Sequence, residues 1–415
     1  MSEAVKILII GNGFGGVYAL KNLCAAFHGD KNTKFAMVGE RNYFLFTPLL
    51  HEVATGSLNP SNIIEPIREV LGCFLDKFYL GKVSSVSLQN RTVSVGDKII
   101  PYDYLVLAPG ATANFYNIPG AEQYSFPLKS IEDAVKIKNH CITQMERATH
   151  ETSQEERRKM LRFVVVGGGP TGVELAAELR ELINESFSKY YPCEILKDVS
   201  VVLVHRDTEL VQQFGPKIKK KTLEVLNKKD IEVMLGSAVK EVGPDYIIIN
   251  ENEKILSDMV IWTAGIKPAE IIFDEPIAKS GNGRILVNEF LQLPSHKEVF
   301  ALGDIAAFKD KKTNEFLPAL AQVAEKESKV VAKNIKFLIN KKPIEEFSYR
   351  SSGILMSLGQ WMAVGEIFNF TFSGHFAWWL WRTVYLIKFL SWRKKIRVAI
   401  DWTMNLFSPR DIAEL

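Results

Sequence analysis

The 415 residues are enough for two or three domains, and 47% apolar and 24% charged residues are typical of a globular chain. A net charge of +3 is too small to favour nucleic acid as a partner. The four cysteines show neither metal-site nor redox-pair spacing, which predicts a reducing compartment and no disulfide framework. We expect no signal peptide and, because no uncharged apolar run reaches about 18 residues, no transmembrane helix.

The first motif is a glycine-rich turn after an apolar, β-branched run at residues 7–10, which predicts a buried parallel strand. Its glycines fit the pattern G-x-G-x-x-G: Gly11, Gly13 and Gly16. Such glycines allow a tight turn, a close approach to a pyrophosphate, and close packing of the strand against the helix expected at 17–24. A second strand, at 34–39, ends at Glu40, whose carboxylate could bind a ribose hydroxyl. The pattern predicts a dinucleotide site, the alternative being a turn without a ligand.

An apolar segment at 43–58 contains a short helical turn between Pro48 and Gly56. It could pack at a domain edge or close over a flat aromatic cofactor, and its periodicity does not choose between them. The charged run at 151–159 is expected to be a solvated linker or helix end and a domain boundary. Between these segments we expect strands at 78–88, 91–95 and 104–108, a loop at 114–120 and a helix at 131–148.

The glycine pattern recurs after a strand expected at 163–166, and a helix is expected to follow at 173–183. The second set of glycines is Gly167, Gly169 and Gly172. One nucleotide fold serves many functions, but two in one chain suggest that one holds a resident cofactor while the other admits a mobile one.

The strand expected at 200–204 should end in a second ribose-binding acid, but it ends in His205 and Arg206. A carboxylate here favours the 2′-hydroxyl of NAD, whereas an arginine can accept the 2′-phosphate of NADP. Asp207 or Glu209 could still supply the acid. Alternatively, the basic pair simply ends a strand at the surface.

The pattern then predicts that the chain returns to its first domain. A strand at 299–305 is expected to end at Asp304, which could bind the ribityl hydroxyls of a cofactor or cap a helix. A helix is expected from 318 to about 338, with its positive end toward whatever precedes it. Strands are also expected at 231–235 and 246–249, and residues 259–268 are expected to close the second nucleotide domain. Residues 347–367 predict two strands of a small third domain.

The carboxy-terminal segment combines aromatic and basic residues. Three tryptophans and a tyrosine lie within 376–390, a basic cluster follows at 393–397, and the next residues divide into an apolar and a polar helical stripe. This composition predicts helices that lie in a membrane interface. The alternative is a buried helical pair at a dimer interface, and both can hold.

Taken together, these motifs resemble type II NADH dehydrogenases, the single-chain NADH:quinone oxidoreductases among the two-dinucleotide-domain flavoproteins. The resemblance covers nearly the whole chain and rests on residues 46–56, 167–175, 262–266, 302–304 and 321–324, with 401–402 and 409–411. It implies an α/β fold with two Rossmann-like domains, for FAD and NAD(P)H, and a small C-terminal domain ending in amphipathic membrane-interface helices. The implied segments are 1–120 and 271–345 for FAD, 121–270 for NAD(P)H, and 346–415 for membrane anchoring and dimerisation.

The resemblance also implies a set of site residues. FAD would be bound by Gly11, Gly13, Phe14, Gly15, Gly16, Glu40, Arg41, Thr47, Pro48, Ala111, Asp304, Leu320, Ala321 and Gln322. NAD(P)H would be bound by Gly167, Gly169, Pro170, Thr171, Gly172, Glu174, His205, Arg206, Ala264 and Gly265. The implied catalytic residues are Glu174, Gln322 and Lys388, with quinone near the last two; Lys388 could assist a reduced quinone oxygen, or reach the lipid headgroups instead.

The implied reaction passes a hydride from NADH to FAD and then two electrons to a membrane quinone, without proton pumping. Whether NADPH is also used stays open because of His205 and Arg206. The sequence also leaves open which quinone is reduced and in which order the substrates bind. The resemblance implies a homodimer, and we expect a peripheral protein on the cytoplasmic side of an inner membrane, with an organelle membrane as the alternative. Two rival functions are a sulfide:quinone oxidoreductase, which needs cysteines at the flavin, and a nucleotide-sensing membrane protein without turnover.

Overall fold

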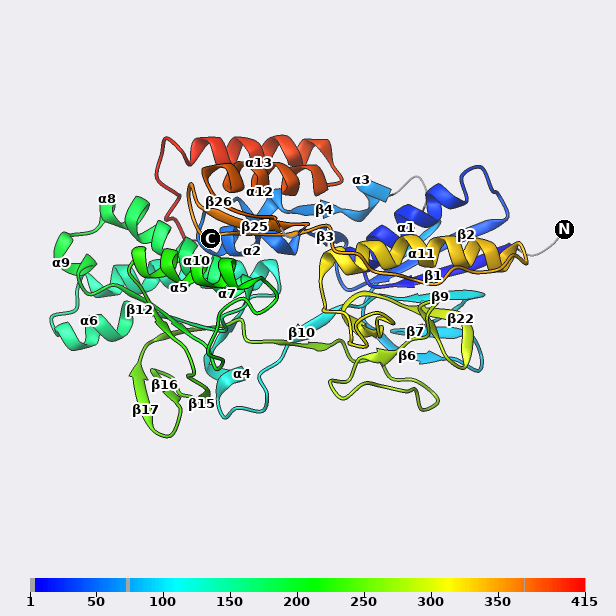
Figure 1. The fold of residues 1–415 in the computed structure, drawn as a ribbon, viewed down its shortest axis with the longest axis horizontal. Coiled ribbons are helices and arrows are strands. Elements are labelled where there is room, and N and C mark those ends of the chain that lie inside the picture. Colours follow the sequence, from blue (N-terminus) through cyan, green and yellow to red (C-terminus); the bar gives the residue numbers. More distant parts are fainter. Residues whose placement is uncertain (1–3, 72–74, 369, 415) are drawn as a thin grey trace. The chain divides into compact units, whose positions relative to one another are not determined.

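The computed structural model describes residues 4–71, 75–368 and 370–414. They form two compact units, each assembled from three segments of the chain (Figure 1). The first unit contains Met1–Leu45, Ile64–Thr112 and Ile266–Ser351, and the second contains Phe46–Ile63, Ala113–Gly265 and Ser352–Leu415. The segment 1–120, expected to serve the FAD domain alone, is therefore divided between the units, and the C-terminal segment belongs to the second.

The first unit is organised by a six-stranded sheet with the order β21-β22-β9-β1-β2-β5. All neighbours pair in parallel except β21. Ile10 lies beside Val38 and Leu107, so that β1, β2 and β9 end at the same edge of the sheet. The strands are β1 (Val5–Ile10), β2 (Thr33–Gly39), β5 (Lys77–Leu80), β9 (Tyr104–Leu107), β21 (Gln292–Leu293) and β22 (His296–Ala301).

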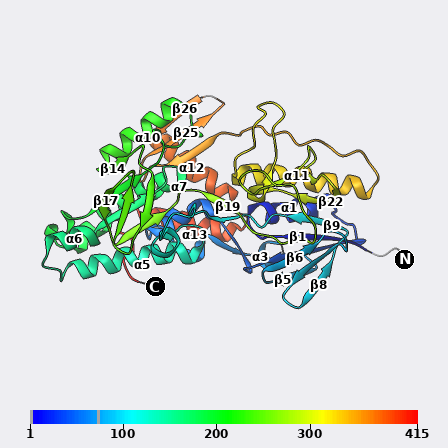
Figure 2. The ribbon, with the colours of Figure 1, turned by 90° about the horizontal axis from the view of Figure 1, so that it is seen from below.

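Helices α1 (Phe14–Ala26) and α11 (Ala321–Ile339) cover one face of this sheet, and the three-stranded sheet β6-β7-β8 covers the other (Figures 1 and 2). Buried apolar residues such as Leu8 and Val93 join the two sheets in one core. The stretch expected as one strand at 78–88 is two strands in different sheets, because the chain turns at Gly81, where φ is +152°. The second sheet consists of β6 (Val83–Ser87), β7 (Thr92–Val95) and β8 (Lys98–Pro101).

Short elements complete the first unit. The strand expected to run to residue 305 ends at Ala301, and a 3₁₀ turn, η4 (Gly303–Ile305), carries Asp304. Helix α11 begins at Ala321 rather than 318. The strands β10 (Ala111–Ala113) and β19 (Ile266–Pro268) pair where the chain passes from one unit to the other. The remaining elements are β3 (Tyr43–Leu45), β4 (Ile64–Pro66), α3 (Ile67–Leu71), β20 (Ile285–Leu286) and β23 (Ala306–Ala307).

The second unit contains an all-parallel sheet with the order β11-β18-β12-β13-β14. Val166 lies beside Val204 and Trp262, so three strands again end together. The strands are β11 (Phe126–Pro127), β12 (Arg162–Val166), β13 (Ser200–Val204), β14 (Ile231–Met234) and β18 (Met259–Trp262). The longer helices are α5 (Ile131–Ala148), α7 (Pro170–Leu182) and α10 (Pro216–Lys228).

Two further features of this unit depart from the sequence-based expectations. The charged run at 151–159 lies inside the unit and largely forms helix α6 (Gln154–Met160). Helix α7 continues into a π-helical turn, η3 (Ile183–Phe187). The other elements are α4 (Ala121–Tyr124), α8 (Ser188–Tyr190), α9 (Cys193–Leu196) and an antiparallel sheet of β15 (Val239–Val242), β16 (Tyr246–Ile249) and β17 (Glu253–Leu256).

The C-terminal segment forms a three-stranded antiparallel sheet followed by two helices, one strand more than expected. They are β24 (Ile354–Ser357), β25 (Ala363–Ile367), β26 (Phe370–Gly374), α12 (His375–Lys388) and α13 (Trp392–Met404). The same unit holds η1 (Thr47–Leu49), α2 (Leu50–Ala54) and η2 (Pro60–Asn62). Within the described part of the chain, every helix is too short or too polar to cross a membrane.

Candidate functional site

The first glycine turn lies at the carboxyl edge of the first sheet. Gly11 has a φ of +98°, and a Cβ there would lie 2.1 Å from the Ala108 carbonyl oxygen. A Cβ on Gly16 would lie 1.8 Å from the Gly11 oxygen, so only glycine allows α1 to approach the strand this closely. Gly13 precedes α1 without a side-chain cap, and nothing lies within 4 Å of a Cβ built on it. The helix N-terminus is therefore open to an anionic group.

The loop that carries Glu40 is fixed by Asn12, a residue that the sequence analysis did not single out. The Asn12 side-chain amide donates to the carbonyl oxygens of Arg41 and Tyr43, each over 2.7 Å. Glu40 follows β2 directly and is exposed. Phe14, expected at the cofactor, packs edge-on against Phe44, with 4.9 Å between ring centroids. A polar residue at the variable position between two motif glycines is the signal that could have identified Asn12.

A second part of the first unit joins this turn. Leu302 packs over Gly15, where a Cβ would come within 2.5 Å of its side chain. The next residue, Gly303, donates its N–H to buried Glu327 Oε2 over 2.6 Å, and a Cβ on it would lie 3.3 Å from Ala324 Cβ in α11. The structure therefore brings Gly15, the Asp304 turn and the start of α11 together.

Two buried ionisable groups, Glu327 and Arg284, interact electrostatically with Asp304. Burial raises the pKa of Glu327 to about 7, and burial lowers the pKa of Arg284. Arg284 donates to the Leu317 carbonyl oxygen over 2.9 Å. At the start of α11, the side-chain oxygen Oε1 of Gln322 accepts a hydrogen bond from the Tyr349 hydroxyl over 2.7 Å. Leu320 precedes the helix without a side-chain cap. The sequence analysis missed Glu327 and Arg284, because only the fold brings them close enough to Asp304 to interact with it.

The second glycine turn repeats this geometry at the edge of the second sheet. Gly167 has a φ of +117°, and a Cβ on it would lie 2.8 Å from the Ala264 nitrogen. A Cβ on Gly172 would lie 1.9 Å from the Gly167 oxygen. Gly169 precedes α7, which begins at Pro170, and no side chain caps that helix. Gly167, Gly172 and Ala264 are thus brought together, beside a second open helix N-terminus.

The basic pair after β13 contacts this turn. His205 Nδ1 accepts the Gly168 N–H over 3.1 Å, and burial lowers the pKa of His205. Arg206 has a side chain 68% exposed, and its Nε lies 3.5 Å from Asp207 Oδ1. Asp207 also lies 3.5 Å from His205 Nε2, whereas Glu209 pairs with Lys219 over 2.7 Å. Arg206 is the more accessible cation of the pair, and Asp207 is the acid at this strand end.

Glu174 points away from solvent into the second unit. Its Oε1 accepts the Ser357 N–H over 3.0 Å, and its Oε2 lies 3.8 Å from His51 Nδ1. Burial raises the pKa of Glu174 well above its usual range and lowers the pKa of His51 to about 4. Neutral His51 and a carboxyl that holds its proton are therefore the states that this site favours.

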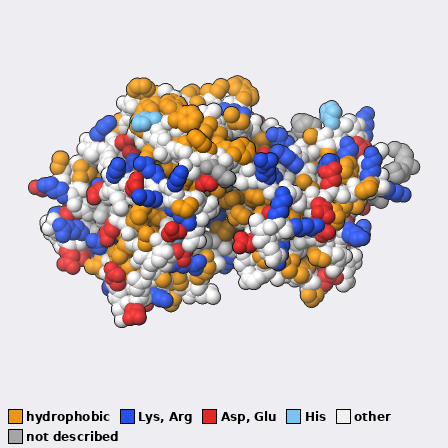
Figure 3. All heavy atoms as spheres, viewed as in Figure 1, with side chains coloured by type: hydrophobic (Ala, Val, Ile, Leu, Met, Phe, Trp, Pro, Cys, Tyr) orange, Lys and Arg blue, Asp and Glu red, His pale blue; other side chains and the backbone are white. Residues whose placement is uncertain are grey.

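The remaining expected residues lie elsewhere. Thr47 and Pro48 form η1 in the second unit, and Ala111 begins β10. Lys388 is the last residue of α12. Hydrophobic side chains gather over α12 and α13 (Figure 3). Exposed members of that surface are Phe376, Trp379, Ile387, Trp392, Ile396, Ile400, Met404 and Phe407.

Comparisons with known proteins agree with this arrangement. Residues 5–328 match the pyridine nucleotide-disulphide oxidoreductase model, and residues 352–411 match the NDH2 C-terminal domain. A probable NADH dehydrogenase of Dictyostelium discoideum is 31% identical, covering 99% of this chain and 91% of that protein. The type II NADH:quinone oxidoreductase Ndh of Mycobacterium tuberculosis is 29% identical, covering 98% and 89%. The structure of NDH2 from Plasmodium falciparum in complex with RYL-552 has a TM-score of 0.92 at 25% identity and covers 99% of this chain and 100% of its own.

Proposed function

Because this chain belongs to the pyridine nucleotide-disulphide oxidoreductases, and among them to the type II NADH dehydrogenases, we propose that it is a non-proton-pumping NADH:quinone oxidoreductase. The observation that carries this proposal is the pair of glycine turns, each at the carboxyl edge of its own parallel sheet and each before an open helix N-terminus. Two such turns suit a resident FAD and a mobile nicotinamide nucleotide.

The residues of the first unit fit FAD. Gly11 and Gly16 allow a turn that a Cβ on either would block, and the open space at Gly13 before α1 could admit a pyrophosphate. Glu40, exposed after β2, could bind an adenosine ribose. Asp304 supplies an acceptor for ribityl hydroxyls. When bound, FAD would accept a hydride from NADH and deliver two electrons to a quinone, chemistry that side chains do not supply.

In the second unit, we assign the nucleotide to the Gly167–Gly172 turn and to Ala264 and Gly265 beside it. Asp207 offers a carboxylate for the 2′-hydroxyl of NADH, and exposed Arg206 offers a cation for the 2′-phosphate of NADPH. We therefore propose that NADH is the preferred donor and that NADPH is also used.

For quinone reduction, we propose roles for Gln322, Lys388 and Glu174. Glu174 is supported by its pKa, which burial raises well above its usual range, because a raised pKa favours the protonated carboxyl that a general acid needs. Lys388 ends α12 beside the exposed apolar surface, where a lipid-soluble substrate would arrive.

We also propose that α12 and α13 attach the protein to the cytoplasmic side of an inner membrane and take part in a homodimer. The exposed apolar side chains of both helices support this assignment, together with Arg393 and Arg397, which are exposed on α13. Aromatic and apolar groups flanked by basic residues are typical of interfacial helices.

The proposal is tested by an anaerobic titration of the purified protein with NADH or NADPH, followed by a short-chain quinone. Bleaching of the flavin absorbance by NADH and its return with quinone would support the reaction. A flavin that neither nucleotide bleaches would overturn it, and sulfide would be the next reductant. The described cysteines do not favour sulfide, since Cys24, Cys141 and Cys193 lie in helices outside both glycine turns.

A further inference from the structure

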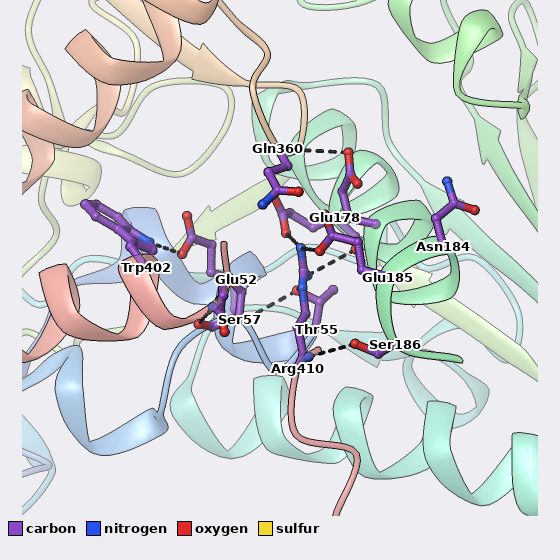
Figure 4. A network of polar contacts seen from close by, with 12 residues as sticks. Glu52, Thr55, Ser57, Glu178, Asn184, Glu185, Ser186, Gln360, Trp402 and Arg410 are labelled. Atoms are coloured by element: carbon purple, nitrogen blue, oxygen red, sulfur yellow. Dashed lines mark hydrogen bonds and ion pairs between the residues drawn. The ribbon is translucent and has the colours of Figure 1, made fainter. Parts of the chain in front are cut away.

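Arg410, six residues after the end of α13, is buried in the second unit and bonded to three separate elements (Figure 4). Its guanidinium donates to Thr55 Oγ1 over 3.0 Å and lies 2.8 Å from Glu178 Oε2 and 3.5 Å from Glu185 Oε2. Its backbone N–H donates to Ser186 Oγ over 2.8 Å. Thr55 follows α2, Glu178 belongs to α7, and the other two residues belong to η3.

The π-helical turn η3 helps to form this arrangement. Glu185 and Ser186 both lie in it, and both bind Arg410. A π-turn adds a residue to the helical repeat and is uncommon, occurring often at functional positions. Its presence at the contact with Arg410 indicates that the end of α7 is shaped to receive the C-terminal segment.

Arg410 also completes a row of contacts between α2 and α7. Glu174 and Glu178 are one turn apart on α7, and His51 and Thr55 are one turn apart at α2. At one end of the row His51 lies 3.8 Å from Glu174, and at the other Arg410 bridges Thr55 and Glu178. Since α2 follows η1 without a break, fixing α2 also fixes the Thr47–Leu49 turn.

We infer that Arg410 is a positioning residue for the reaction, which holds α2 and the Thr47–Leu49 turn in register with the nucleotide-binding helix α7. The inference rests on the proposed function and on Thr47 and Pro48 of that turn, which the family resemblance implies to bind FAD. It assigns the end of the chain a role separate from membrane attachment, because Arg410 lies beyond α13 and is bonded to the interior of the unit rather than to its exposed surface.

The test compares Arg410→Met with Arg410→Lys in the full-length holoprotein. Misplacement of reacting groups by about 1 Å can cost as much as 10²-fold, so we expect Arg410→Met to slow flavin bleaching by NADH roughly 10- to 100-fold. The KM for NADH should change much less than kcat, because the Gly167–Gly172 turn keeps its residues. Arg410→Lys retains the charge near Glu178 without the planar fork and should recover part of the rate.

Arg157→Met is the matched control, because Arg157 is also largely buried and pairs with a buried carboxylate, Asp198, over 3.0 Å, but lies in α6. It should leave the rate unchanged. A wild-type rate in Arg410→Met would overturn the inference, whereas a wild-type protein that NADH does not bleach would overturn the proposed function.

Two further variants keep the inference testable if Arg410→Met does not fold. Arg410→Met combined with Glu178→Met removes both buried charges, which should restore folding but not the rate of bleaching. A chain shortened to end at Ser408 keeps α12 and α13, so it should still bind lipid vesicles while bleaching as slowly as Arg410→Met. Normal bleaching in either variant would count against a positioning role.

Discussion

Replacing Trp402 by phenylalanine removes one hydrogen bond from the buried carboxylate of Glu52. The Trp402 indole N–H donates to Glu52 Oε2 over 2.5 Å, and both side chains are almost completely buried. Burial raises the pKa of Glu52 to about 7, while the Trp402 bond opposes that rise. The variant should therefore raise the pKa of Glu52 further and make its charged form more costly.

The size of the effect depends on pH. A hydrogen bond to a charged group contributes roughly 1.5–3 kcal/mol, and one to a neutral group about 1 kcal/mol. Because the folded pKa lies above the unfolded value of about 4.5, stability from protonated Glu52 is present at low pH and is lost as pH rises through about 7. Trp402→Phe should thus cost more at pH 8 than at pH 6, on the order of 3 °C in Tm at the higher pH for a chain of 415 residues.

The assay is thermal unfolding of the wild type and the variant at both pH values, repeated in a Glu52→Leu background. Without the carboxylate, the pH-dependent part of the loss should disappear, which separates it from lost indole packing against Trp381. An equal loss at pH 6 and pH 8, or an unchanged pH dependence in the Glu52→Leu background, would refute the reasoning.

Three other variants test the remaining assignments. Gly16→Ala should lose bound flavin, because its Cβ would lie 1.8 Å from a backbone oxygen. Gly281→Ala should retain flavin, because nothing lies within 4 Å of a Cβ at that position. The flavin released on desalting measures both outcomes. Arg206→Glu should raise the KM for NADPH and leave the KM for NADH unchanged. Unchanged NADPH kinetics would contradict the assignment of Arg206 to the 2′-phosphate. Ile396→Ser combined with Ile400→Ser should weaken pelleting with anionic vesicles, since both residues are about half exposed on α13, yet leave flavin bleaching by NADH intact.

The glycine turns could be predicted from sequence because their requirements are local. Each needs a strand, glycines at fixed spacing and a helix, and a Cβ at the first and third glycines would strike backbone within the same turn or the adjoining strand. The resemblance also named Asp304 and Gln322 as FAD-binding residues, which stays a prediction. The structure brings the turn that carries Asp304 close to Gly15 and to Ala324 near the start of α11.

What could not be predicted depends on contacts between distant segments. The carboxyl of Glu174 lies between His51 and Ser357, which are 123 and 183 residues away in sequence, and no local pattern indicates those contacts. Periodicity left open what the 43–58 segment packs against. The structure shows the C-terminal segment bonded to it, as where the Asn405 side-chain amide donates to the Ser57 carbonyl oxygen over 2.5 Å. Hydrophobic patterning specifies which face of a helix is buried, but not which partner buries it.

These contacts change how a C-terminal truncation should be interpreted. A chain that ends at Gly374 lacks the exposed apolar face of α12 and α13, so we expect a protein that retains flavin in its first unit and no longer pellets with vesicles. The same truncation removes Trp402 from Glu52 and Arg410 from Glu178, which leaves two carboxylates without their buried partners. A loss of quinone reduction in that chain would therefore not distinguish lost membrane access from a displaced α2. Only substitutions confined to the exposed face of α13 separate the two, because they leave its inward bonds in place.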